Sequence, residues 1–174
     1  MPGDSLTYGF DVRPDQSWTA LVSAKSHIHI DNEGQCGDTT TGMVYRLHQF
    51  DLSRYDAFFI MGGSNDILLD GELEKICQNM RTIVTTFKEQ GKPVYLGIPP
   101  LTKMESAMYG WQNASDVEKH NDELRRYRQW LLPTEKKRSA SSSTSTKPCS
   151  KSNGGQAAIS MPTASIPMPK LRPS

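Results

Sequence analysis

The sequence is poor in cysteine, has no long apolar run and shows no secretory signal. Its cysteines are few, widely separated and odd in number, namely Cys36, Cys77 and Cys149. They exclude a fully paired disulfide framework, show no metal-binding spacing and are typical of the reducing cytosol. No apolar run approaches the roughly 20 residues of a membrane helix, and the first residues have neither the charged nor the apolar region of a signal peptide. We therefore expect a cytoplasmic protein with no membrane span and no metal site.

The sequence also lacks an excess of charge of either sign. Its formal net charge is +1, which gives no electrostatic basis for binding nucleic acid or an anionic membrane. We expect no nucleic-acid partner and no cofactor, and the sequence predicts no particular oligomeric state.

Residues 132–174 contain no aromatic side chain and are dominated by Ser, Pro, Lys, Thr, Ala and Gly. Such a composition buries too little apolar surface to offset the entropy of ordering the chain. The sequence therefore predicts one folded domain over residues 1–131 and a disordered tail over 132–174. The basic cluster Lys136–Arg138 is expected to be solvated charge within that tail.

Apolar residues recur at helical spacing in several segments of the predicted domain and form short runs in others. The expected helices are residues 17–25, 40–50, 72–90 and 116–131, and the expected strands are residues 27–31, 56–61 and 93–98. Gly91 is the expected end of the longest helix, and Ser115 the expected N-cap of the last. The two later strands are expected to be buried on both faces. Strands that alternate with helices predict an α/β fold with a parallel sheet.

Three glycine-bearing segments carry the candidate chemistry: residues 3–9 (GDSLTYG), 32–40 (NEGQCGDTT) and 62–66 (GGSND). The first precedes the first helix and the others follow predicted strands, and ligands bind at the carboxyl ends of parallel strands. Acyl transfer needs a hydroxyl nucleophile and N–H donors aimed at the oxygen that becomes negative. Each segment alone is typical of a turn, but their order after successive strands favours one shared site.

These segments resemble the three signature blocks of the SGNH (GDSL) hydrolases, and the run PVYLGIPPL with the helix after it is also similar to that family. The resemblance extends from Gly3 to Leu131. It implies a three-layer α/β/α sandwich with a flavodoxin-like parallel sheet, and hydrolysis of a small-molecule ester or thioester. It further implies that Ser5 is the nucleophile. The oxyanion hole would consist of the Ser5 N–H, the Gly37 N–H and the Asn65 side-chain amide.

The sequence lacks the Asp-x-x-His element with which that family ends, so no acid–base pair is identified. Only Met1 and Pro2 precede the first block, where the family has a central strand, and proline cannot donate to a central ladder. We therefore expect an exposed, incompletely closed sheet. We interpret the chain as an incomplete reading of a longer gene. A frameshift is one explanation for the tail, and a native tail is the other. Because loss of the histidine costs serine hydrolases on the order of 10⁶ in turnover, we expect a very weak or inactive esterase.

None of the chain's 4 histidines falls in such an element. Asp116 and His120 lie four residues apart on one helix, and an exposed ion pair is their expected role. His27 and His29 share a face of the first expected strand but have no third ligand, so they predict no metal site. His48 is expected near the end of a helix, where its charge is favourable.

The substrate is weakly constrained by sequence. Residues 101–113, after the last predicted strand, contain Met104, Met108, Tyr109 and Trp111. These side chains fit an acyl or sugar pocket and core packing equally well, and short acyl esters, acetylated carbohydrates and lysolipids all remain open. Two other interpretations are a non-catalytic module that binds an anion or nucleotide at its glycine loops and an unstable fragment without a function of its own.

Overall fold

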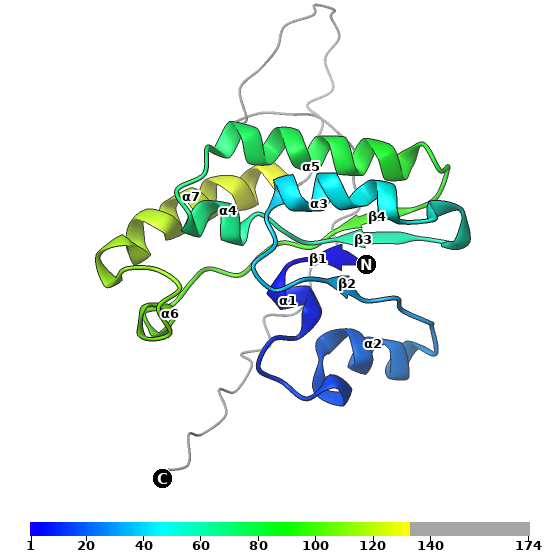
Figure 1. The fold of residues 1–174 in the computed structure, drawn as a ribbon, viewed down its shortest axis with the longest axis horizontal. Helices are drawn as coiled ribbons and strands as arrows, with labels where there is room; N and C mark the ends of the chain where they lie inside the picture. The colour runs from blue at the N-terminus through cyan, green and yellow to red at the C-terminus, as the bar shows by residue number, and fades with distance from the viewer. Residues whose placement is uncertain (133–174) are drawn as a thin grey trace, which may run out of the picture.

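The computed structural model describes residues 1–132, drawn in colour in Figure 1. The domain predicted for residues 1–131 lies within this range. The disorder predicted for the tail and the solvated cluster Lys136–Arg138 lie outside the described residues.

The strands of the described chain are short and pair in parallel. They are β1 (Pro2–Gly3), β2 (Glu33–Gly34), β3 (Phe58–Ile60) and β4 (Val94–Leu96). β1 pairs with β2, and β3 pairs with β4. An isolated parallel bridge between Gly3 and Met61 joins the two pairs, so the spatial order is β2-β1-β3-β4.

The helices lie on two sides of these strands. They are α1 (Ser5–Tyr8), α2 (Trp18–Ser26), α3 (Thr40–Arg46), α4 (Ser64–Leu68), α5 (Leu73–Lys88), α6 (Glu105–Met108) and α7 (Val117–Leu131), with 3-10 turns at Pro14–Gln16, Leu47–Gln49, Leu52–Arg54 and Ala114–Asp116. In Figure 1, α3 and α5 lie on one side of the strands and α1 and α2 on the other. The four long helices expected from periodicity are thus present, with ends shifted by a few residues.

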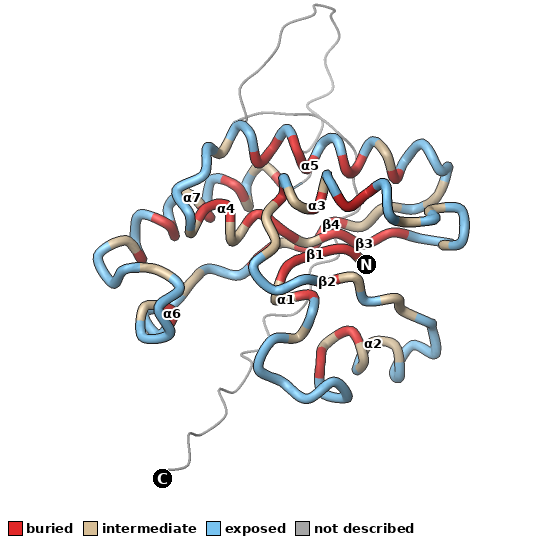
Figure 2. Tube along the Cα trace, viewed as in Figure 1, coloured by how far each residue is buried: buried red, intermediate tan, exposed pale blue. Residues whose placement is uncertain are grey.

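The core lies between the strands and the apolar face of α5. Figure 2 shows the buried positions of α5 on the side that faces the strands. Phe87 of α5 stacks on Phe58 of β3, with ring centroids 4.4 Å apart and planes at 7°. On the opposite face Trp18 of α2 packs on Phe59, with centroids 5.3 Å apart. Side chains of β3 are therefore covered from both sides, as the apolar run at 56–61 predicted.

The strand predicted over residues 27–31 is wrong. His27 instead ends α2 in the left-handed conformation, with φ 54°, and the strand is the two-residue β2 that follows. Its pairing partner β1 is equally short, and pairing limits how far a strand extends. Pro2 is tolerated in β1 because the hydrogen bonds from Glu33 N and Gln35 N go to the carbonyls of Met1 and Gly3, both at 3.0 Å.

Two further expectations are wrong. Ser115 does not cap α7, because a 3-10 turn runs directly into that helix and places Asp116 at the N-cap position. β4 is buried at Leu96 only, since Val94 and Tyr95 are partly exposed. Within residues 1–132, no helix combines the length and the apolar character that spanning a bilayer requires.

Candidate active site

The three glycine-bearing segments leave the same edge of the paired strands. Gly3 of β1 pairs with Gly34 of β2 and bridges to Met61, immediately after β3. Because both contacts are parallel, the chain continues in the same direction after β1, β2 and β3, and the segments that follow lie side by side. The structure thus brings the segments that carry Ser5, Gly37 and Asn65 to one rim.

Ser5 is the first residue of α1. Asp4 is the N-cap, and its carboxylate accepts a hydrogen bond from Leu6 N at 2.9 Å. The Ser5 carbonyl accepts from the amides of Gly9 and Phe10, both at 3.0 Å. Since the first amides of a helix have no partner within the helix, the Ser5 N–H has no carbonyl to bond within α1.

Gly37 lies in the turn between β2 and α3, with φ 75°. This left-handed conformation favours glycine. It is exposed, and a Cβ built on it would meet no atom within 4 Å. The next residue, Asp38, donates its amide to Gln35 O at 3.2 Å, which closes the turn.

Asn65 ties the third segment to the second. Its Nδ2 donates to the Asp38 carbonyl at 2.8 Å. An amide nitrogen carries two hydrogens, so one remains for another acceptor. The neighbouring Asp66 is buried, and its carboxylate accepts from Thr40 N at 2.8 Å and Thr40 Oγ1 at 2.7 Å. The second and third segments are therefore joined by three hydrogen bonds.

The Asp4 carboxyl lies close to both of these segments. It is 1% exposed. Burial raises its pKa to about 6, the Leu6 amide opposes that rise, and the charges of Asp38 and Asp66 add to it. Each of the three segments thus contributes one carboxyl group, and the charges of Asp38 and Asp66 are close enough to raise the pKa of Asp4.

The raised pKa of Asp4 predicts a free energy of unfolding that falls as pH increases. Between the unfolded value of 3.8 and about 6, the folded chain binds more protons than the unfolded chain, so the free energy of unfolding decreases as pH rises. From pH 5 to pH 8 this group contributes a loss of about 1.4 kcal/mol. Asp4→Asn keeps an oxygen for the Leu6 amide and should flatten this slope. Urea unfolding at both pH values checks it, and an unchanged slope in the variant would contradict it.

The expected surface pair of Asp116 and His120 is wrong. His120 is 2% exposed. Its Nδ1 lies 2.6 Å from Gln112 Oε1 and its Nε2 lies 3.3 Å from Asp70 Oδ1. The reason is that α7 packs on α4, which turns His120 inward towards the residues after α4. Asp116 bonds instead to Asn113 and Ser115, and these contacts lower its pKa.

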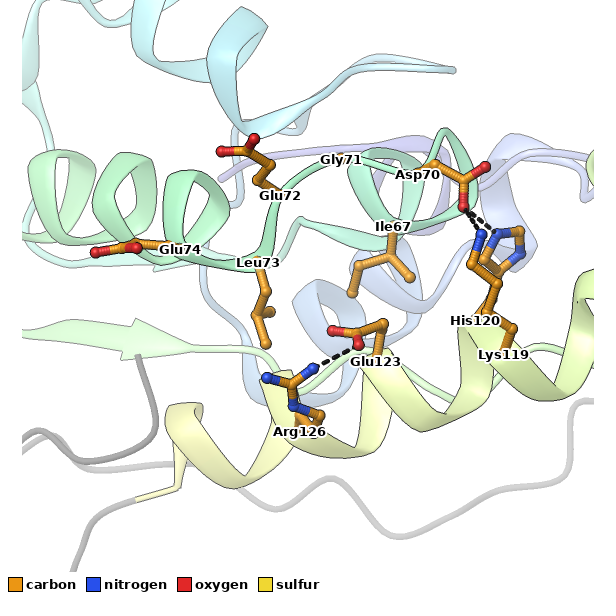
Figure 3. Close-up of a pocket in the computed structure, with 10 residues that line it drawn as sticks. All are labelled: Ile67, Asp70, Gly71, Glu72, Leu73, Glu74, Lys119, His120, Glu123 and Arg126. Atoms are coloured by element: carbon orange, nitrogen blue, oxygen red, sulfur yellow. Dashed lines mark hydrogen bonds and ion pairs between the residues drawn. The ribbon is translucent and has the colours of Figure 1, made fainter. Parts of the chain in front are cut away.

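His120 lines a groove of about 490 Å³ between the residues after α4 and the helix α7 (Figure 3). Asp70 sits at one end with Lys119 and His120 directed towards it, and Glu123 pairs with Arg126 further along α7. None of Ser5, Gly37 and Asn65 lines this groove. Because both imidazole nitrogens are engaged, we interpret His120 as a residue that fixes the start of α7.

The other histidines are exposed, and none of them bonds to Ser5 within residues 1–132. His27 and His29 do not share a strand, and His29 Nε2 lies 2.7 Å from Asp31 Oδ1. His48 lies in the 3-10 turn that directly continues α3, near a helix end as expected. The described part of the chain has no group of three or more His, Cys, Asp or Glu arranged to hold a metal ion.

The segment at 101–113 forms a surface cluster rather than core. Met104 and Met108 are exposed, and so are Tyr109 and Trp111. Trp111 stacks on Tyr109 with centroids 5.2 Å apart and meets the edge of Phe10 at 5.9 Å. Phe10 is the residue whose amide bonds to the Ser5 carbonyl, so the aromatic cluster is connected to the turn that carries Ser5.

Sequence reasoning missed the residues that hold the segments together. Asp66 directly follows Asn65 in the third segment, so its position was a usable signal. Arg46 and Asn79 carried no such signal: each lies in a helix, Arg46 8 and 13 residues from Asp38 and Glu33 and Asn79 39 and 38 residues from Thr40 and Thr41, with no motif to mark the pairing. Asn79 Nδ2 donates to Thr40 Oγ1 at 3.1 Å and to Thr41 Oγ1 at 2.9 Å.

Comparisons with known proteins support the resemblance to the SGNH (GDSL) hydrolases. A family model described as the GDSL-like Lipase/Acylhydrolase family matches residues 2–138. Comparison with curated proteins found no match. Among solved structures, a lipolytic protein of the G-D-S-L family from Desulfitobacterium hafniense DCB-2 is similar with a TM-score of 0.56 and 22% identity, over 69% of this chain and 65% of that one.

Two further structures are similar to a comparable degree. The G-D-S-L family protein from Veillonella parvula DSM 2008 has a TM-score of 0.53 and 25% identity, over 72% of this chain and 69% of that one. AlinE4, an SGNH-hydrolase family esterase, has a TM-score of 0.54 and 22% identity, over 72% of this chain and 67% of that one. This chain thus spans about two thirds of the length of these proteins and shares their fold. Since the family model covers most of its residues, the chain belongs to the GDSL-like lipase/acylhydrolase family.

Proposed function

We propose that the chain is a serine ester hydrolase in which Ser5 is the nucleophile. The observation that carries the proposal is the parallel pairing of β1 with β2 and its bridge to Met61, because it sets the segments of Ser5, Gly37 and Asn65 at one rim. The fold we propose around them is a three-layer α/β/α sandwich with a parallel sheet.

The chemistry assigned to this rim is acyl transfer. Ser5 Oγ attacks the ester carbonyl carbon and gives up its proton to a base, and the carbonyl oxygen becomes negative. We assign the stabilisation of that oxygen to the Ser5 N–H, the Gly37 N–H and the second hydrogen of Asn65 Nδ2. The carbonyl then reforms, the alcohol leaves with a proton, and water releases the acid from Ser5 by the same steps.

The proposed turnover is low. No histidine of the chain bonds to Ser5 in the described residues, so deprotonation of Ser5 falls to water or buffer. Loss of the histidine costs serine hydrolases on the order of 10⁶ in turnover, so attack by Ser5 without such a base is slow. Activated esters with good leaving groups are therefore the substrates expected to react.

Hydrolysis of p-nitrophenyl butyrate by the purified chain tests the proposal. We expect slow release of p-nitrophenol, and Ser5→Ala should reduce it at least about tenfold because the nucleophile is absent. Ser115→Ala, at an exposed serine remote from the rim in sequence, is the matched control and should leave the rate unchanged.

Equal rates in the Ser5→Ala variant and the unaltered chain would refute the assignment of Ser5. Protection against thermal unfolding by inorganic phosphate, without Ser5-dependent hydrolysis, would favour a non-catalytic anion-binding module. Turnover typical of an efficient esterase would show that a base acts on Ser5 and would contradict the proposed low rate.

A further inference from the structure

A buried arginine joins the two ends of the turn that carries Gly37. Arg46, the last residue of α3, is 7% exposed. Its Nε and Nη2 donate to Asp38 Oδ2 at 3.0 and 2.5 Å, and its Nη1 donates to the Glu33 carbonyl at 3.2 Å. Glu33 directly precedes the turn and Asp38 directly follows Gly37. One guanidinium therefore fixes both ends of residues 34–37.

The same contact extends to Asn65. Arg46 holds the Asp38 side chain, and the Asp38 carbonyl accepts the hydrogen bond from Asn65 Nδ2. A shift of Asp38 would consequently move the peptide of Gly37 and remove the acceptor that orients the Asn65 amide. Gly37 itself is exposed, so its own packing contributes little to fixing its N–H.

The geometry requires arginine rather than any cation. The planar guanidinium offers five N–H donors in a fixed arrangement, whereas the lysine ammonium is a single point of charge. Here three donors reach two acceptors in different directions. The Phe50 ring lies 5.8 Å from Arg46 Cζ and supports the guanidinium through a cation–π contact.

A buried ion pair by itself is a weak source of stability, because desolvation of both charges offsets their attraction. What such a pair does supply is one fixed arrangement of the groups that it contacts. We propose that Arg46 is a positioning residue that holds the Gly37 N–H and the Asn65 amide in one oxyanion site facing Ser5. This inference rests on the proposed function and adds to it a residue outside the three signature segments.

The test compares Arg46→Lys with Tyr45→Ala, which changes the exposed neighbour of Arg46 on the same helix. For Ser5-dependent hydrolysis of p-nitrophenyl butyrate, we expect Arg46→Lys to lower kcat about 10- to 100-fold with KM within about twofold, because donors that bind the transition state are displaced. Tyr45→Ala should leave both unchanged. In ¹⁵N-labelled protein, the Gly37 amide and the Asn65 side-chain amide should shift in Arg46→Lys but not in Tyr45→Ala.

Several outcomes would overturn the proposal. A folded Arg46→Lys variant with unaltered kcat and unaltered Gly37 and Asn65 resonances would do so. So would equal loss of kcat in Tyr45→Ala, which would indicate a general effect on α3. If Arg46→Lys does not fold, Asp38→Asn weakens the same contact and the same shifts and loss of kcat are expected. If the unaltered chain shows no Ser5-dependent hydrolysis, the proposed function fails, and the resonances alone then decide whether Arg46 fixes the turn.

Discussion

Replacing Gly34 with alanine is expected to lower the free energy of unfolding by about 3 kcal/mol or more, because β2 and α1 approach too closely at this residue to admit a side chain. A Cβ on Gly34 would lie 2.3 Å from Tyr8 N and 2.8 Å from Thr7 C and Tyr8 Cα. These are backbone atoms, so relief requires α1 to move as a unit. Because Ser5 begins α1, Ser5-dependent hydrolysis should fall with stability.

Gly37→Ala is the matched control for Gly34→Ala, three residues along the same segment. A Cβ on Gly37 meets nothing within 4 Å, so the expected cost is only that of holding φ at 75° with a side chain, about 1 kcal/mol. Urea unfolding of both variants measures the difference. Equal stability of the two would show that the contact between β2 and α1 is looser than the structure indicates.

Asp66→Ala is expected to reduce the free energy of unfolding by about 3 kcal/mol, because it leaves two buried donors without an acceptor. The Asp66 carboxylate accepts from Thr40 N and Thr40 Oγ1. Thr40 Oγ1 in turn accepts from Asn79 Nδ2, so the bonds run in one direction from α5 through α3 to α4. Removing the final acceptor affects every member of that series. It also removes two of the three hydrogen bonds between the second and third segments, so Ser5-dependent hydrolysis should fall too.

Asp122→Ala provides the control for loss of a carboxylate. Its side chain is 69% exposed and pairs with Arg125 on the surface of α7, and such pairs contribute little. We expect a change within about 0.5 kcal/mol. Thermal and urea unfolding distinguish the two variants. A loss in Asp66→Ala as small as that in Asp122→Ala would mean that water replaces the carboxylate at Thr40.

Much of the candidate site could be predicted from sequence because its parts are local. Glycine at a turn with positive φ, a serine at a helix start and an amide after a buried strand each depend on residues within a few positions of one another. The order of the segments then indicated a common edge. The helix over 72–90 was predictable for a related reason: burial of one face imposes a period that the sequence records.

The errors concern residues whose partners no local pattern marks. His120 was expected to pair with Asp116, four residues before it, but its Nδ1 contacts Gln112, eight residues before it, and its Nε2 contacts Asp70, 50 residues before it. The alternation at 27–31 resembles a strand, but the strand forms later, where β1 is available to pair. Arg46 carried no signal, since nothing near it in the sequence marks Glu33 and Asp38 as its partners.

The sequence by itself determined the family, the four longer helices and the segments that hold Ser5, Gly37 and Asn65, because spacing and turn chemistry are encoded within short stretches. Only the tertiary structure decided that Gly3 lies between Gly34 and Met61, that Arg46 joins both ends of the Gly37 turn, and that His120 contacts Gln112 and Asp70. Those choices follow from which buried donors and acceptors meet once the elements pack. Hydrogen-bond partners across a packed interior are set by three-dimensional proximity, which local sequence patterns do not record.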